Sequence, residues 1–121
     1  ADVSYPAPEG IAWPGAGAIL AAIEVTVGSR AAVVGKPNEP IFLAGLARAG
    51  GGRPLVIGDR LETDIEGAAR LGWDSLLVLT GISTRADADR IAGTPAAPTY
   101  VADDLSALVA DGSAPARGYA G

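Results

Sequence analysis

Short apolar runs alternate along the chain with segments whose apolar residues recur at helical spacing. The clearest runs are residues 55–57 and 75–79, and weaker ones lie at residues 31–34 and 100–101. Brief, nearly continuous apolar runs are typical of strands buried in a parallel sheet. Because a predicted helix separates each run from the next, the pattern predicts an α/β fold with right-handed crossovers.

The predicted helices comprise one before the first strand and one after each strand. In the first, over residues 15–27, apolar residues recur three to four positions apart, and Gly28 is a typical stop signal. Asn38 can cap the second, over residues 40–49, in which Leu43, Leu46 and Ala47 would face the core. The other three helices are expected over residues 63–71, 84–91 and 105–110.

The ends of the chain show neither pattern. Residues 1–14 are rich in proline, so we expect an extended loop leading into the first helix, without a strand. Residues 112–121 consist mainly of Gly, Ala, Pro and Ser, which predicts a flexible tail. The Gly15-Ala16-Gly17 segment follows no strand and lacks the Lys-Ser/Thr ending of a phosphate loop, which indicates packing at a helix start.

Composition narrows the chemistry. The 121 residues suffice for one domain with one core, and neither cysteine nor histidine occurs among them. A thiol nucleophile, a histidine base, a Ser-His-Asp triad and a Cys/His zinc site are therefore excluded. Any catalysis by this chain must use carboxylates, Lys or Arg, hydroxyl groups and a metal ion. A sequence without cysteine also fits a cytoplasmic protein.

Charge and hydropathy restrict the partners. The net charge is −5, and no cluster of Lys and Arg is present, so nucleic acid and anionic membranes are poor candidate partners. No apolar run approaches the roughly 18 residues of a membrane span. The sequence also has no methionine, even at position 1. Removal of an initiator methionine before alanine would explain this, and the alternative is that the chain is the later part of a longer protein.

Three charged residues follow two of the predicted strands. Asp59 comes directly after strand 55–57 and Gly58, Asp64 follows five residues later, and Lys36 comes after strand 31–34 and Gly35. The carboxyl ends of parallel strands open on one edge of the sheet, where α/β proteins bind ligands. A carboxylate there can hold Mg²⁺ and a lysine can offset phosphate charge. The alternatives are that Asp59 caps a helix and that Lys36 is a solvated surface lysine.

Three sequence blocks carry a family resemblance. They are Val-Gly-Lys-Pro at residues 34–37, Gly-Asp-Arg-Leu-Glu-Thr-Asp-Ile at 58–65 and Leu-Val-Leu-Thr-Gly-Ile-Ser at 77–83. In this order and spacing they resemble the haloacid dehalogenase (HAD) superfamily, in particular its phosphoglycolate, glycerol phosphate and p-nitrophenyl phosphate phosphatases. The resemblance covers about residues 5–108. It implies a three-layer Rossmann-like parallel sheet and Mg²⁺-dependent hydrolysis of a small phosphorylated metabolite through an aspartyl-phosphate.

The resemblance also implies roles for the three charged residues. Lys36 would be the catalytic lysine that binds the substrate phosphoryl group and steadies the nucleophile. Asp59 would be a direct Mg²⁺ ligand. Asp64 would take part in catalysis by supporting the lysine or a metal-bound water. Arg60, Glu62 and Thr63 fall within the same motif, and we assign them no direct role.

The departures from the family are as informative as the match. Family members attack phosphorus with an Asp-x-Asp motif that follows an N-terminal strand, and a Ser/Thr on the next strand binds the phosphoryl group. The cap that selects the substrate precedes the lysine. Here the only Asp-x-Asp is residues 87–89, in a polar helical pattern. We therefore expect residues 1–121 to be the carboxyl-terminal part of a HAD-like core, without N-terminal strands or cap, and inactive alone.

The missing strands would leave a sheet edge and apolar faces uncovered. We expect the chain to pair with its missing N-terminal half, from the same gene or a second chain, or to form a homo-oligomer. The alternative function is a non-catalytic α/β binding or interaction module that kept these motifs after losing the nucleophile. A receiver-like phosphoacceptor domain is disfavoured, because it needs an acid pair on its first strand.

Overall fold

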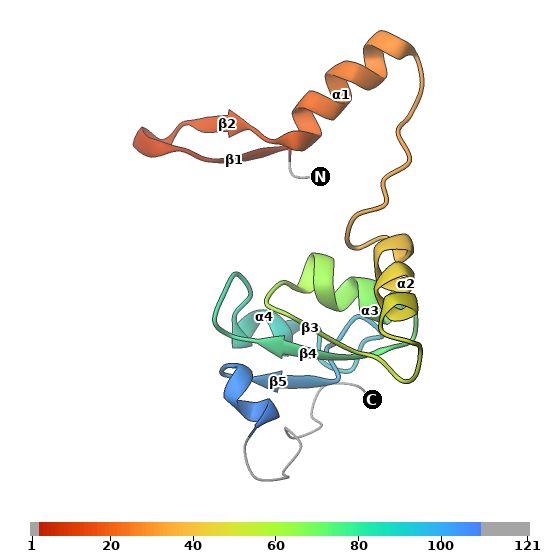
Figure 1. The fold of residues 1–121 in the computed structure, drawn as a ribbon. Helices are drawn as coiled ribbons and strands as arrows, with labels where there is room; N and C mark the ends of the chain where they lie inside the picture. The colour runs from red at the N-terminus through yellow and green to blue at the C-terminus, as the bar shows by residue number, and fades with distance from the viewer. Residues whose placement is uncertain (1–2, 110–121) are drawn as a thin grey trace. The chain divides into compact units, whose positions relative to one another are not determined.

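The computed structural model describes residues 3–109, and the chain divides into two units, Ala1–Val33 and Val34–Gly121 (Figure 1). The predicted tail at residues 112–121 and the end of the last predicted helix at Ala110 lie outside the described residues. Within residues 3–109, no helix is both long enough and apolar enough to cross a membrane.

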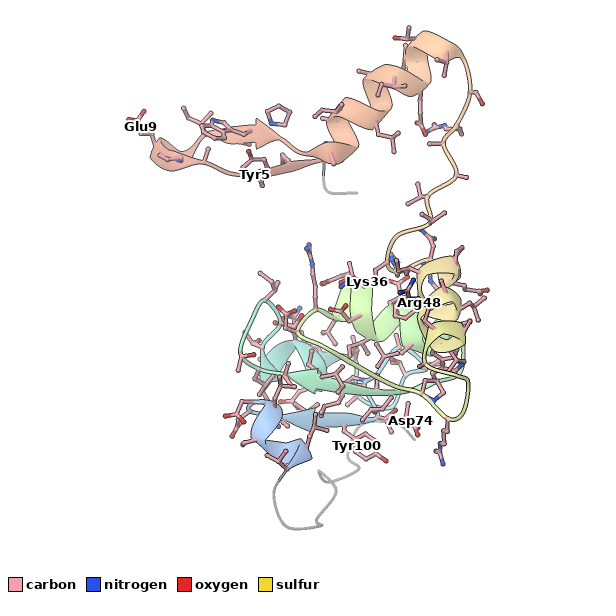
Figure 2. The ribbon with its side chains drawn as sticks, viewed as in Figure 1. Tyr5, Glu9, Lys36, Arg48, Asp74 and Tyr100 are labelled. Carbon is pink, nitrogen blue, oxygen red and sulfur yellow. The ribbon has the colours of Figure 1, made fainter. Side chains whose placement is uncertain are left out.

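The first unit begins with a hairpin. Strands β1 (Ser4–Pro6) and β2 (Ala12–Pro14) pair antiparallel, with Tyr5 opposite Trp13. Their rings meet edge to face with centroids 6.0 Å apart (Figure 2), a cross-strand contact that stabilises such a pair. Between the strands, Glu9 and Gly10 both have positive φ and reverse the chain within the turn η1 (Pro8–Gly10). The expectation of a strand-free leading loop was therefore wrong, because this turn brings two proline-containing segments into register.

Helix α1 (Ala16–Val27) follows, and Gly28 ends it in the left-handed conformation, as predicted. The strand expected at residues 31–34 does not form. The Ala31 amide donates a hydrogen bond to the Glu24 carboxylate at 2.8 Å, and Arg30 bonds the same carboxylate. A strand exists only where a neighbour accepts its backbone hydrogen bonds, and the described residues supply none here.

The second unit is built on a parallel sheet, which confirms the predicted α/β class. Strands β3 (Leu55–Gly58), β4 (Asp74–Val78) and β5 (Tyr100–Ala102) lie in the order β3–β4–β5. In register, Leu76 of β4 lies between Ile57 of β3 and Tyr100 of β5. The strands predicted at 55–57, 75–79 and 100–101 are confirmed within one residue at each end.

Elements pack on both faces of β4, which gives three layers there. On one face Leu77 packs with Ile65 and Ala88, which come from the π-helical turn η2 (Leu61–Ile65) and from α4 (Arg85–Arg90). On the other face Leu76 and Val78 pack with Ala107 of the 3₁₀ turn η3 (Leu105–Leu108). Alternate residues of β4 thus belong to different layers, as the period of a strand requires.

The remaining helices differ from expectation in detail. The helix expected over residues 63–71 divides into η2 and α3 (Glu66–Arg70), and the last helix is the short 3₁₀ turn η3. Helix α2 (Glu39–Arg48) has Asn38 at its N-cap position, but this side chain donates to the Gly35 carbonyl instead of capping the helix.

The expected core face of α2 was wrong for Leu43 and Ala47, which are both exposed, while Leu46 is half-buried. Phe42 turns inward instead and lies edge to face with Trp73, with ring centroids 6.5 Å apart. The reason is that α2 packs against α3. Position 67 on α3 is a glycine, and the Phe42 ring occupies the space that a side chain there would need.

Candidate functional site

Asp59 lies immediately beyond the carboxyl end of β3 and is fixed by the loop that follows β4. Its Oδ2 accepts a hydrogen bond from the Ile82 amide at 2.9 Å, and its backbone carbonyl accepts one from the Ser83 amide at 2.9 Å. The contacts come from a neighbouring strand's loop and not from the helix that follows Asp59. The alternative that Asp59 caps a helix is therefore wrong, since Arg60 holds the N-cap position of η2.

Asp64 and Lys36 form an ion pair. Lys36 Nζ lies 2.7 Å from Asp64 Oδ1. Asp64 is buried, with 7% of its side chain exposed, whereas 52% of the lysine side chain is exposed. A buried carboxylate is stabilised by such pairing. The pair places a fixed ammonium group at the surface, with its remaining N–H groups open to an approaching anion.

The other oxygen of Asp64 is held by its own turn. Asp64 Oδ2 accepts from the Arg60 amide at 3.3 Å and lies 3.5 Å from the Thr63 hydroxyl. Asp64 therefore links the turn after Asp59 to Lys36, which lies 28 positions earlier in the chain. This geometry brings Lys36 and the two aspartates to one end of the sheet, as predicted, although Lys36 follows a loop and not the strand expected at residues 31–34.

Two glycines allow the carboxylates to approach the backbone. A side chain at Gly58 would overlap Asp64, and a side chain at Gly81 would overlap the Asp59 carboxylate. Gly58 ends β3, and Gly81 follows β4. Both glycines therefore have a steric reason to be present, because any larger residue would displace an acid of the candidate site.

The candidate site can supply one carboxylate to a cation. No group of three or more Asp, Glu, His or Cys side chains suited to holding a metal occurs within residues 3–109. Asp64 is engaged by Lys36, and Asp59 Oδ1 accepts no hydrogen bond from the described residues. The donor set therefore fits Mg²⁺ in part, since this cation prefers oxygen ligands and is held by one or two carboxylates together with waters and substrate phosphates.

The Asp-x-Asp of residues 87–89 lies in α4, as its polar pattern indicated. Asp87 closes a capping box with Thr84, whose amide and hydroxyl both donate to its carboxylate at 2.8 and 2.6 Å. Arg90 pairs with the same carboxylate. These hydrogen bonds, first those from the Thr84 side chain and then its backbone, hold the pKa of Asp87 below its ordinary value. Asp87 is thus the N3 partner of the capping box whose N-cap is Thr84, and not a nucleophile at the end of a strand.

Sequence reasoning missed Ser83. This residue is buried, with 5% exposure, and its hydroxyl accepts a hydrogen bond from the Leu61 amide at 3.0 Å. It lies in the Leu-Val-Leu-Thr-Gly-Ile-Ser block, and the signal that could have identified it is a serine two residues after the glycine that follows a buried strand.

An apolar groove of about 510 Å³ lies beside β3. Its walls include Phe42 and Leu46 of α2, Val56 of β3 and Trp73, and Lys36 and Asp64 also line it. The groove adjoins the edge of the sheet, because β3 pairs only with β4 among the described strands. The structure therefore leaves apolar surface uncovered next to the candidate site.

The comparisons with known proteins cover most of this chain but a minor part of the proteins it matches. The HAD-hydrolase-like family description matches residues 33–108. The chain is 40% identical over 111 residues to the D-glycerol 3-phosphate phosphatase of Mycobacterium tuberculosis, which covers 91% of this chain and 31% of that protein. It is 40% identical over 84 residues to Chronophin of Homo sapiens, covering 68% of this chain and 28% of that protein.

Solved structures agree. The glycerol phosphate phosphatase of Mycobacterium tuberculosis in complex with magnesium superposes with a TM-score of 0.72 at 40% identity, over 88% of this chain and 32% of that chain. The p-nitrophenyl phosphatase of Archaeoglobus fulgidus superposes with a TM-score of 0.71 at 34% identity, over 89% of this chain and 42% of that chain. The chain thus spans about a third of the length of these proteins.

Proposed function

The chain belongs to the HAD-like hydrolase family, and from this premise we propose that it is the carboxyl-terminal part of a Mg²⁺-dependent phosphatase. The substrate would be a small phosphomonoester of the glycerol phosphate or phosphoglycolate type. The names of the relatives support this class of substrate, since they include D-glycerol 3-phosphate phosphatase and glycerol-3-phosphate phosphatase. The proposal includes the cytoplasmic location that the sequence favours.

The observation that carries the proposal is the Lys36–Asp64 pair beside Asp59. Asp64 fixes the Lys36 ammonium group at 2.7 Å, while Asp59 keeps one carboxylate oxygen without a hydrogen bond from residues 3–109. A fixed cation and a free carboxylate at the carboxyl end of a parallel sheet can serve a phosphate ester and its metal ion. We would not expect a lysine that is only a solvated surface residue to pair with a buried carboxylate, as Lys36 does.

Each residue of this chain then has a separable role. Lys36 would bind the phosphoryl oxygens and stabilise the negative charge that they share in the transition state. Asp64 would hold the ammonium group in position. Asp59 would contribute one oxygen to Mg²⁺. Mg²⁺, when bound, would neutralise charge on the phosphoryl oxygens.

The covalent step needs a carboxylate that this chain does not supply. In the proposed reaction, a carboxylate oxygen of the amino-terminal half attacks phosphorus, and the bond from phosphorus to the ester oxygen breaks. The leaving alcohol takes a proton from an acid of that half. Water then attacks the acyl phosphate, which releases inorganic phosphate and restores the carboxylate. The 121 residues alone should therefore be inactive.

The open side of β3 supports the need for that half. Leu55 and Ile57 of this strand are each 40% exposed, and the groove of about 510 Å³ lies beside them. Unpaired strand edges and apolar grooves are normally covered in native proteins. We propose that the amino-terminal half covers this side and brings its carboxylates to Asp59. A homo-oligomer would be the alternative cover.

The test begins with an intact-mass spectrum of the purified material, followed by phosphatase assays on the chain alone and with its amino-terminal half. p-Nitrophenyl phosphate and glycerol 3-phosphate serve as substrates, with Mg²⁺ or with a chelator. We expect Mg²⁺-dependent turnover only in the completed protein. Lys36→Ala and Asp59→Asn should each lower kcat by at least about a hundredfold.

Matched controls come from the opposite end of the sheet. Arg53 and Asp74 form an ion pair at 2.6 Å, and Asp74 begins β4 (Figure 2). Arg53→Ala and Asp74→Asn should leave turnover unchanged. If Lys36→Ala and Asp59→Asn are as active as these controls, the site assignment is wrong. If the completed protein hydrolyses no phosphomonoester, the non-catalytic binding module takes its place.

A further inference from the structure

The loop after β4 contacts Asp59 more closely than its sequence suggested. Three consecutive residues contribute. Gly81 leaves the space that the carboxylate occupies, the Ile82 amide donates to Oδ2, and the Ser83 amide donates to the backbone carbonyl. The loop is therefore hydrogen-bonded to both the backbone and the side chain of Asp59. One carboxylate oxygen is occupied, which orients the other.

Ser83 also binds the turn that follows Asp59. Its buried hydroxyl accepts from the Leu61 amide at 3.0 Å, two residues beyond Asp59. The intervening Arg60 amide donates to Asp64 Oδ2 at 3.3 Å. Successive amides of one turn are thus bound to Asp64 and to Ser83. Through these bonds the orientation of Asp59 is coupled to the position of the Lys36–Asp64 pair.

We propose that Ser83 is a positioning residue that holds Asp59 so that its Oδ1, which accepts no hydrogen bond from the described residues, would be available to a metal ion. The proposal rests on the proposed function, because it takes Asp59 as a metal ligand. Residues that hold a metal ligand by hydrogen bonds raise the affinity of the site by preorganising it. Without the Ser83 hydroxyl, the Leu61 amide loses its partner and the turn from Asp59 to Leu61 is free to shift. The effect should fall on metal binding rather than on substrate binding.

The experiment measures Mg²⁺ binding directly in the completed protein, by calorimetry and by Mn²⁺ electron paramagnetic resonance, alongside the kinetics. Ser83→Ala should weaken metal binding by about tenfold. The KM for p-nitrophenyl phosphate and the kcat at saturating Mg²⁺ should stay close to those of the unmodified protein. Ser83→Thr retains the hydroxyl and should recover most of the lost affinity.

Two further variants separate positioning from stability. Thr84→Ala, one residue along, removes the N-cap of α4 without touching Asp59, so it should lower the melting temperature and leave metal affinity unchanged. Gly81→Ala puts a methyl group against the Asp59 carboxylate from an exposed position. It should weaken metal binding at least as much as Ser83→Ala.

The outcomes are distinguishable. Metal affinity that is unchanged in both Ser83→Ala and Gly81→Ala overturns the positioning role, while a loss in Asp59→Asn still supports the phosphatase. An equal loss of affinity in Ser83→Ala and Thr84→Ala reduces Ser83 to a structural residue and also overturns the proposal. If Asp59→Asn binds Mg²⁺ normally, the metal assignment itself fails.

Discussion

Strands β3 and β4 have similar sequences and different surroundings. Leu76 and Leu77 of β4 are fully buried, whereas Leu55 and Ile57 of β3 are each 40% exposed. Ile57 lies directly beside Leu76 in the sheet, so the difference arises within one pair of neighbouring strands. An apolar run therefore predicts a strand whose side chains are buried in the complete protein. Whether they are buried within this chain depends on the elements that pack against the strand.

The same difference separates the two sides of the candidate site. On one side, Ile82 and Ser83 of the loop after β4 hold Asp59 by hydrogen bonds. On the other side, β3 has no strand beside it among the described residues, and the apolar groove is open. In the proposed function, this open side is the one that the amino-terminal half would cover.

The largest expected effect tests this comparison directly. Leu77→Ala should destabilise the second unit by about 2–5 kcal/mol, because it leaves a cavity between Ile65 and Ala88. Ile57→Ala in the neighbouring strand should cost about 1 kcal/mol, because much of that side chain is already in water. Urea unfolding of the 121-residue chain, followed by circular dichroism, measures both.

Binding of the amino-terminal half should reduce the difference in unfolding free energy between these two variants. In the completed protein the cost of Ile57→Ala should rise towards that of Leu77→Ala, since the edge would then be covered. Equal costs in the chain alone would mean that β3 is already covered, for example by a second copy. Sedimentation of the same samples distinguishes that case.

A smaller effect concerns the packing of α2 on α3, next to the groove beside β3. Gly67→Ala should destabilise by about 1–3 kcal/mol, because the added methyl group would overlap the Phe42 ring where α2 packs on α3. Gly45→Ala is the matched control, since it lies in α2 with open space around it. It should stabilise the protein by about 0.5–1 kcal/mol. Thermal melts of both variants check the packing, and a neutral Gly67→Ala would contradict it.

The smallest effect is a pH dependence on the β4 side. Because hydrogen bonds from Thr84 lower the pKa of Asp87, the folded state binds the proton of this carboxyl more weakly than the unfolded state does. The stabilisation is therefore fully present above the unfolded pKa and is lost as pH falls through the lower folded pKa. Asp87→Asn should be less stable than the parent near pH 7, and the difference should shrink below about pH 4. Urea titrations at several pH values measure it, and a constant difference would contradict the assignment.

Much of the fold followed from local pattern. The runs at residues 55–57 and 75–79 are strands β3 and β4. Gly28 ends α1 and Gly72 comes soon after α3, and both glycines have positive φ. These signals are local, because strand period and left-handed stops depend on residues close in sequence. The strand-free loop expected over residues 1–14 and the strand expected at 31–34 were both wrong. In each case the outcome depends on a hydrogen-bonding partner that the segment's own pattern does not name.

The candidate site divides in the same way. The order of Asp59 and Asp64, after strand β3 and within the next turn, was sufficient to place them at one end of a parallel sheet, whereas Lys36 follows a loop and is placed there by its bond to Asp64. The sequence by itself determined this sheet and the kinds of charge at its carboxyl end. Only the tertiary structure decided that Asp64 holds Lys36, that Ser83 and Ile82 hold Asp59, and that β3 is left open. The physical reason is that periodicity fixes which way a side chain points, whereas a contact between residues more than twenty positions apart exists only after the chain has folded.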